Sequence, residues 1–124
     1  MQFNNNGQAI YLQIADYICE KVLLQEWNPD DKVPSVRELA IQLEVNPNTV
    51  MRTYDFLKHQ DIINDKRGIG YFITPQAFKS AIAYRKREFL EKELPTVYRI
   101  MNMLGLETED LAKGYEKFKK QYTV

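Results

Sequence analysis

The chain has 124 residues, with 17 basic and 17 acidic side chains, so its formal net charge is zero. This length fits one domain, or one small domain with an appendage, and the charge balance excludes a strongly basic protein. The single cysteine excludes an intrachain disulfide and a multi-cysteine metal site. No apolar run resembles a membrane span or a secretion signal, so we expect a cytoplasmic protein.

The first predicted element is a helix over residues 9–25. Apolar side chains such as Ile14 and Ile18 recur there at helical spacing, and polar ones such as Gln13 and Asp16 occupy the other face. Cys19 falls within the apolar pattern. We therefore expect it to be a buried, reduced thiol.

Two short helices joined by a tight connection come next. Ser35 can cap the first helix, and Glu38, three residues later, completes a capping box. Asn46 can cap the second helix, and Pro47 suits its first position, where a missing N–H leaves no partner unsatisfied. The second helix is predicted to run to about Gln60. Two helices in this arrangement predict a helix-turn-helix.

A short hairpin is predicted after these helices. Residues 62–64 and 71–74 are typical of strands, and the loop between them carries two glycines beside a basic tip. Three helices followed by such a hairpin predict a winged helix-turn-helix. We therefore expect a mainly α fold with a small β-hairpin, in which residues 1–75 form the winged domain.

Residues 76–124 are predicted to form a short C-terminal helical dimerisation region. Pro95 predicts a break or kink, and Thr108 begins a last helix whose first turn is acidic. The region has more apolar surface than two isolated helices would expose in water. Its aromatic and large apolar residues include Tyr84, Phe89, Tyr98, Met101, Met103, Leu111, Tyr115, Phe118 and Tyr122. They require a partner surface, either the first domain or a second copy of the chain.

Catalysis and metal binding find little support in the sequence. His59 is the single histidine, and no serine or cysteine has a visible reason to approach it. With Asp61 and Asp65 it makes only a weak set of metal ligands. No glycine-rich loop suits a phosphate. We expect no enzymatic activity, no metal and no cofactor.

The helix predicted to begin after Asn46, which is the third in the chain, starts with side chains suited to the major groove of DNA. Asparagine can hydrogen-bond adenine and arginine can bind guanine, which makes Asn48, Thr49 and Arg52 candidates for base contacts. Asn46 is a candidate too, with capping alone as its alternative. For Arg52 the alternative is a side chain in solvent.

Two more candidate contacts lie outside that helix. Arg37, in the first turn of the preceding helix, can bind phosphate or base, or else form a surface ion pair with Glu38 or Glu44. Arg67 and Gly68 form the hairpin tip, where a basic residue beside a glycine can enter the minor groove. A solvated turn is the alternative for this tip.

Four motifs between residues 10 and 74 resemble the GntR family of bacterial transcription regulators. They are Tyr11-Leu12-Gln13-Ile14-Ala15, Val33-Pro34-Ser35-Val36-Arg37-Glu38-Leu39-Ala40, Val45-Asn46-Pro47-Asn48-Thr49-Val50 and Arg67-Gly68-Ile69-Gly70-Tyr71-Phe72-Ile73. The third motif and the short tail resemble the YtrA-type branch, in which a two-helix region replaces the large effector-binding domain and serves dimerisation. The resemblance implies that Arg37, Asn46, Asn48, Thr49, Arg52, Arg67 and Gly68 lie at or next to DNA.

The chain departs from the family pattern at three positions. Met51 stands where many members have arginine, and Arg52 can take over that contact. Asp30 and Asp61 stand where glycine is usual, and aspartate tolerates the left-handed conformation such turns need.

Together these features predict a homodimeric transcription regulator, acting as a repressor, that binds a palindromic site on double-stranded DNA. We expect no membrane partner, and an unidentified small-molecule effector stays open. The alternative is a winged-helix module that binds other proteins, which the neutral charge would permit. Such a module would have no need of the polar helix start at residues 46–52 or of the basic hairpin tip.

Overall fold

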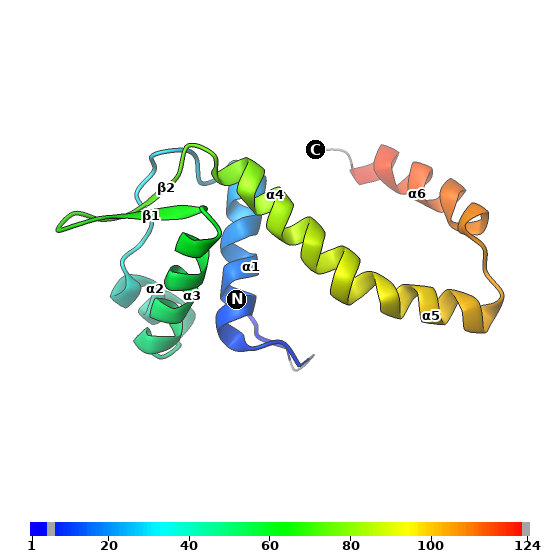
Figure 1. The fold of residues 1–124 in the computed structure, drawn as a ribbon, viewed down its shortest axis with the longest axis horizontal. Coiled ribbons are helices and arrows are strands. Elements are labelled where there is room, and N and C mark those ends of the chain that lie inside the picture. Colours follow the sequence, from blue (N-terminus) through cyan, green and yellow to red (C-terminus); the bar gives the residue numbers. More distant parts are fainter. Residues whose placement is uncertain (5–6, 123–124) are drawn as a thin grey trace. The chain divides into compact units, whose positions relative to one another are not determined.

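The computed structural model describes residues 1–4 and 7–122, with the side chain of Tyr122 outside that description. The elements in chain order are α1 (Ile10–Leu23), α2 (Val36–Leu43), α3 (Pro47–His59), β1 (Ile63–Lys66), β2 (Gly70–Ile73), α4 (Ala77–Glu88), the π-helical segment η1 (Phe89–Glu93), α5 (Leu94–Leu104) and α6 (Thr108–Tyr122). They form two compact units, residues 1–86 and 87–124. The predicted order of helices and hairpin is confirmed (Figure 1).

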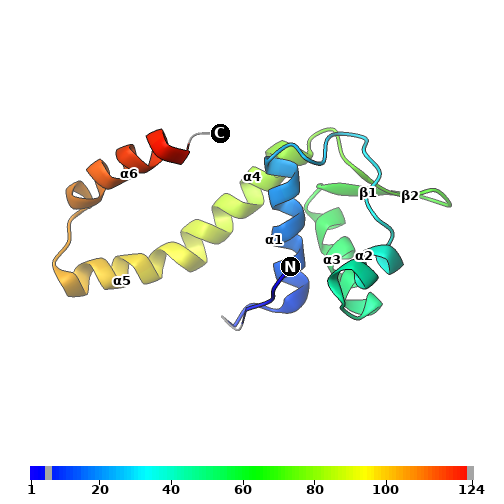
Figure 2. The ribbon, with the colours of Figure 1, turned by 180° about the vertical axis from the view of Figure 1, so that it is seen from behind.

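The first unit has one apolar core built on α3. α1 and α2 both pack against α3, and β1 follows it closely (Figures 1 and 2). The largest fully buried apolar side chains are Tyr54, Tyr84, Ile14, Ile18, Leu39, Leu57, Ile62, Ile63, Ile73 and Val50. Cys19 is buried as expected, and burial raises the pKa of its thiol to about 12, which keeps it protonated and unreactive.

Local signals set the starts of α2 and α3. Ser35 Oγ accepts a hydrogen bond from the Glu38 N–H (3.1 Å), and Glu38 Oε1 accepts one from the Ser35 N–H (3.1 Å). The bond from Ser35 also lowers the pKa of Glu38. At α3, Asn46 Oδ1 accepts from the Asn48 N–H (2.8 Å), with Pro47 next in the chain. The predicted capping box and cap are confirmed.

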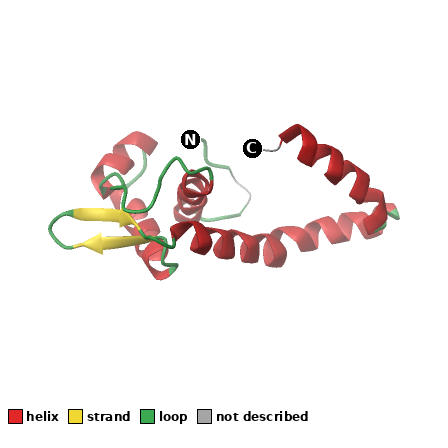
Figure 3. Cartoon of the chain, turned by 90° about the horizontal axis from the view of Figure 1, so that it is seen from above, coloured by secondary structure: helices red, strands yellow, loops and turns green. Residues whose placement is uncertain are grey.

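The hairpin pairs Ile63 with Ile73 and Lys66 with Gly70, so its strands reach further toward the tip than expected (Figure 3). The tip turns at Gly68, whose φ of +78° suits glycine. A short edge segment lies along β2, because the Val33 N–H donates to Tyr71 O (2.9 Å) and the Ile73 N–H donates to Asp31 O (2.9 Å). The hairpin is thereby held to the chain that leads into α2.

Two aspartates occupy left-handed turn positions. Asp30 has φ of 68° and Asp61 has φ of 61°, so both adopt the conformation for which glycine is usual. At Asp61, neighbouring bonds hold the turn. Its carbonyl accepts from Thr74 Oγ1 (2.8 Å), and its carboxylate accepts from the Gln76 side chain.

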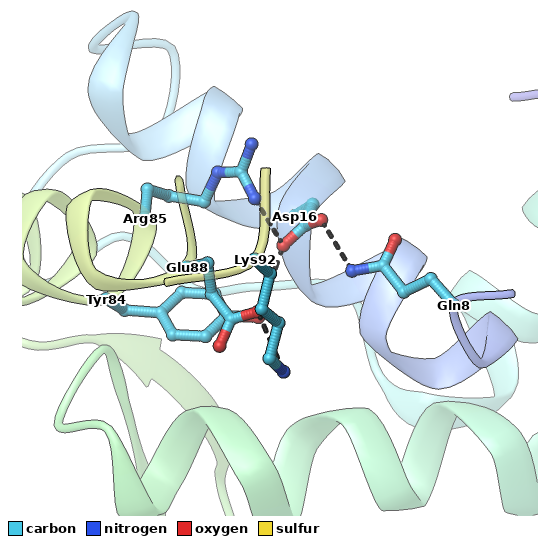
Figure 4. A network of polar contacts seen from close by, with 6 residues as sticks. All are labelled: Gln8, Asp16, Tyr84, Arg85, Glu88 and Lys92. Carbon is cyan, nitrogen blue, oxygen red and sulfur yellow. Dashed lines mark hydrogen bonds and ion pairs between the residues drawn. The ribbon is translucent and has the colours of Figure 1, made fainter. Parts of the chain in front are cut away.

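The expected polar face of α1 is partly covered. Gln13 is buried, because its side chain donates to Asn4 O (3.0 Å) and Gln8 O (2.9 Å) of the segment before α1. Figure 4 shows a second contact between that segment and α1, in which the Asp16 carboxylate accepts a hydrogen bond from Gln8 Nε2 (3.0 Å). The segment before α1 thus covers part of the polar face of the helix. The covering segment directly precedes α1 and is not helical, so the periodicity of the helix could not reveal it.

Most of α4, up to residue 86, belongs to the first unit. Its residues Ala77, Ala81 and Tyr84 are buried, and the Tyr84 and Phe56 rings form a T-shaped pair with centroids 5.1 Å apart. Arg85 forms an ion pair with Asp16 (3.1 Å), as Figure 4 also shows. Tyr84, one of the aromatic residues expected to need a partner surface, thus finds it within this unit.

The second unit contains the interruption expected near Pro95. The chain remains helical there, but widens into the π-helical η1 just before the proline. In an α-helix a proline ring clashes with the carbonyl group four residues earlier. The wider π turn accommodates the proline, so the helix continues without a loop. Lys92 within η1 pairs with Glu88 (3.1 Å; Figure 4). α5 ends at Leu104, and the next residue, Gly105, permits the turn with a φ of +71°.

The helices of the second unit expose large apolar side chains. α6 turns back from the end of α5 and diverges from it (Figures 1 and 2). Exposed fractions reach 63% for Leu104, 62% for Tyr115 and 58% for Phe118. Met101 is the buried exception among this unit's described side chains. Within the described residues, no helix has the length and apolar character needed to cross a membrane.

Tyr54 joins three parts of the first unit: α3, the chain before α2, and the hairpin. The side chain is fully buried in α3, its hydroxyl donates to Pro34 O (2.6 Å), and its ring meets Tyr71 of β2 with centroids 4.8 Å apart. Tyr54→Phe should lower the free energy of unfolding by about 1–2 kcal/mol, because the carbonyl loses its donor. Urea denaturation measures this loss.

Tyr71→Phe is the matched control, since within the described residues the Tyr71 hydroxyl reaches only the weak acceptor Met51 Sδ, at 3.8 Å. Its cost should stay below about 0.5 kcal/mol. Equal losses in both variants would show that the bond to Pro34 adds nothing.

Candidate nucleic-acid interface

One face of α3 is fixed in the core and the other is free for contact. Val50, Tyr54 and Leu57 are buried, so the opposite face of the same helix points to solvent. Asn48 and Arg52 are exposed on it, four residues apart, and are therefore neighbours on the helix surface. Thr49 is half-buried beside them. The first two turns of α3 thus present an amide and a guanidinium together, as base-edge recognition requires.

Asn46 has a structural role that is visible in the fold. Its side-chain oxygen accepts from the Asn48 N–H at the start of α3. The residue remains exposed, so the cap leaves its amide group accessible. A contact between Asn46 and DNA stays a prediction.

Arg52 does not extend freely into solvent. Its guanidinium carbon lies 4.1 Å from the centroid of the Tyr11 ring, which comes from α1. That distance is typical of a cation–π contact. Within residues 1–4 and 7–122, Arg52 forms no salt bridge. The charge is held by an aromatic face and is not neutralised by a carboxylate.

Arg37 is exposed in the first turn of α2. The ion pair with Glu38 or Glu44 that was its alternative is absent from the described part of the chain. Glu38 instead uses its carboxylate in the capping box. The Arg37 cation at this helix start is consequently available to an external anion.

The hairpin tip is open to solvent. Arg67 and Gly68 are both exposed, and a Cβ placed on Gly68 would meet no atom within 4 Å. Lys66, the preceding residue, lies over the Phe72 ring with its Nζ 4.3 Å from the centroid. The tip therefore carries two cations and has space for a close approach by a polyanion.

Two residues of this region were missed by reasoning from the sequence. Tyr11 looked like part of the α1 helical pattern, and nothing local indicated that its ring would meet Arg52. Met51 stands where many family members have arginine, and the sequence indicated no contact of its own. In the structure its sulfur accepts from the Tyr71 hydroxyl of β2. Both contacts join segments that are distant in sequence, so no local signal could have revealed them.

No catalytic arrangement accompanies this surface in the described residues. His59 Nδ1 lies 2.7 Å from Asp55 O, within its own helix. Among the side chains that the structure describes, no three of His, Cys, Asp and Glu form a group that could hold a metal ion.

Comparison with known proteins gives the same interpretation. Residues 10–73 match the family described as "Bacterial regulatory proteins, gntR family". The HTH-type transcriptional regulator YhcF of Bacillus subtilis is 42% identical over 114 residues, covering 91% of this chain and 92% of YhcF. The HTH-type transcriptional repressor YtrA of Bacillus subtilis is 36% identical over 106 residues, covering 86% of this chain and 81% of YtrA.

Solved structures agree with the sequence comparisons. A GntR family transcriptional regulator from Listeria monocytogenes has a TM-score of 0.73 and 32% identity, covering 92% of this chain and 98% of its own. The relatives are transcription regulators and not enzymes. The exposed face of α3 therefore belongs to a DNA-binding winged helix-turn-helix, and the chain is a member of the GntR family of bacterial transcriptional regulators.

Proposed function

We propose that this protein is a cytoplasmic transcriptional repressor that binds a palindromic operator as a homodimer. In this proposal residues 1–75 contact DNA and residues 76–124 serve dimerisation. The observation that carries it is the set of exposed arginines Arg37, Arg52 and Arg67, none of which forms a salt bridge in the described residues. In a chain with 17 acidic and 17 basic residues, such placement favours a few directed contacts over a general field.

The roles of the contacts follow from their positions. Asn48, Thr49 and Arg52 read base edges in the major groove from the start of α3. Arg37 binds backbone phosphate at the start of α2, where the helix dipole adds to its charge, and Asn46 supports α3 as its cap. Arg67, beside Gly68, reaches the minor groove.

The homodimer rests on the apolar surface of the second unit. Val97, Ile100 and Leu104 recur at helical spacing along α5 and are exposed, as are Tyr115 and Phe118 on α6. Exposed apolar clusters of this kind mark interaction sites. A second copy of the chain supplies the same apolar helices, and a twofold dimer presents two winged domains to a symmetric site.

A small-molecule effector also has room in the first unit. A hollow of about 530 Å³ has a lining that includes Gln8, Asp16 and Arg85, with polar groups from the segment before α1. A polar ligand suits this lining.

The direct test is a gel shift with DNA from upstream of the protein's own gene, against random DNA of equal length and salt. A repressor of this type should bind the upstream DNA about 10³-fold or more tightly. YtrA of Bacillus subtilis is a transcriptional repressor, which supports the proposal that this chain represses transcription and does not activate it. Equal binding to both DNAs would favour a protein-interaction module.

Arg52→Ala should weaken operator binding by roughly 1–3 kcal/mol, with a much smaller loss on random DNA, because a base contact is lost. Titration of both DNAs at one salt concentration measures the two losses. If they are equal, Arg52 contacts phosphate and carries no sequence information.

Arg67→Ala should reduce affinity and lower the slope of log K against log salt by about 1, because one fewer cation displaces counterions. Lys113→Ala is the control, since Lys113 is an exposed cation on α6, away from the wing sequence. If the Arg67→Ala variant keeps the wild-type affinity and slope, the hairpin tip does not contact DNA.

Combining Ile100→Glu with Leu104→Glu should convert the dimer to a folded monomer, because two charges would enter an apolar interface. Operator affinity should fall about a hundredfold as the linked second half-site is lost. Sedimentation and gel shift measure the two effects. Asn102→Glu, on the opposite face of α5, should leave both unchanged; a double variant that still sediments as a dimer would contradict the proposed interface.

A further inference from the structure

The contact between Arg52 and Tyr11 crosses from the recognition helix to α1. Arg52 is exposed on α3, whereas Tyr11 lies in the first turn of α1 and is half-buried. The guanidinium carbon lies 4.1 Å from the tyrosine ring centroid. A long and flexible side chain at the candidate base-reading position thus rests on an aromatic surface before any DNA is present.

Tyr11 is itself held by residues that flank Arg52 on α3. Thr53, the next residue, donates its hydroxyl to Tyr11 O (2.8 Å). Phe56, one turn further along, meets the Tyr11 ring edge to face, with centroids 6.3 Å apart and an interplanar angle of 77°. The backbone and the ring of Tyr11 are therefore both fixed relative to the helix that carries Arg52.

This arrangement matters because an arginine loses rotamer freedom when it binds a base. A side chain already placed on a rigid surface loses less freedom at that moment, so more of the contact energy appears as affinity. A guanidinium that packs on a ring by its face keeps the N–H donors in its plane available. Those donors are the ones that bind the O6 and N7 atoms of guanine.

We propose that Tyr11 is a positioning residue for Arg52, holding the guanidinium plane in the orientation that reads a guanine in the operator. The inference rests on the proposed function, in which Arg52 makes a base contact. Tyr11 would then determine sequence discrimination from α1 without touching DNA.

The experiment measures dissociation constants on two DNAs at one salt concentration: the site that the wild-type chain selects from a random pool, and a scrambled sequence. Tyr11→Leu removes the aromatic face but keeps an apolar side chain, and should weaken binding to the selected site about fivefold, with little change on scrambled DNA. Tyr11→Phe keeps the face and should bind as the wild type does. Thermal melting of each variant verifies the fold.

The decisive comparison is the double variant. If Tyr11 acts through Arg52, then Tyr11→Leu should have no further effect in an Arg52→Ala background. A fivefold loss in that background would show that Tyr11 acts on the fold, and would overturn the inference, as would a Tyr11→Leu variant that binds normally. An Arg52→Ala variant with undiminished discrimination would overturn it together with the proposed base contact of Arg52, while leaving operator binding by a homodimer intact. A wild-type chain that selects no site would overturn both.

Discussion

The buried Tyr54 side chain is the constraint on which the geometry of the first unit depends. Its hydroxyl bonds to Pro34 just before α2, and its ring packs on Tyr71 of the hairpin. One residue of α3 thereby fixes the helix relative to both neighbours that flank it in the winged domain. Burial raises the pKa of Tyr54, so the hydroxyl keeps its proton and the bond at neutral pH.

From this constraint the proposed DNA surface follows. Because Tyr54 faces inward, Asn48 and Arg52 face outward on the same helix. Because α2 and the hairpin are held to α3, the cation of Arg37 and the tip at Arg67 are presented by a single compact unit. A neutral chain can thus offer several placed cations without a strongly basic surface. In this account, affinity depends on dimerisation and on directed contacts more than on long-range charge.

The sequence predicted what depends on neighbouring residues. Ser35 with Glu38, and Asn46 with Pro47, set helix starts by bonds that span three residues or fewer, and both starts are confirmed. The burial of Gln13 was not predicted, because the helical pattern does not encode the hydrogen bonds to the non-helical segment before α1. The contact of Arg52 with Tyr11 was not predicted either, because it joins segments that are distant in sequence. Pro95 indicated an interruption, but not that a π-helical turn would absorb it. The assignment of the candidate site residues to DNA remains a prediction.

The central claim is that two winged domains, joined by their apolar tails, read one symmetric DNA site. The most direct measurement is selection of binding sites from a random DNA pool by the intact wild-type chain, followed by sequencing. The account predicts an inverted repeat whose half-sites are separated by about one helical turn, roughly 34–36 Å between centres. Enrichment of a single unrepeated motif, or of no motif, would contradict it.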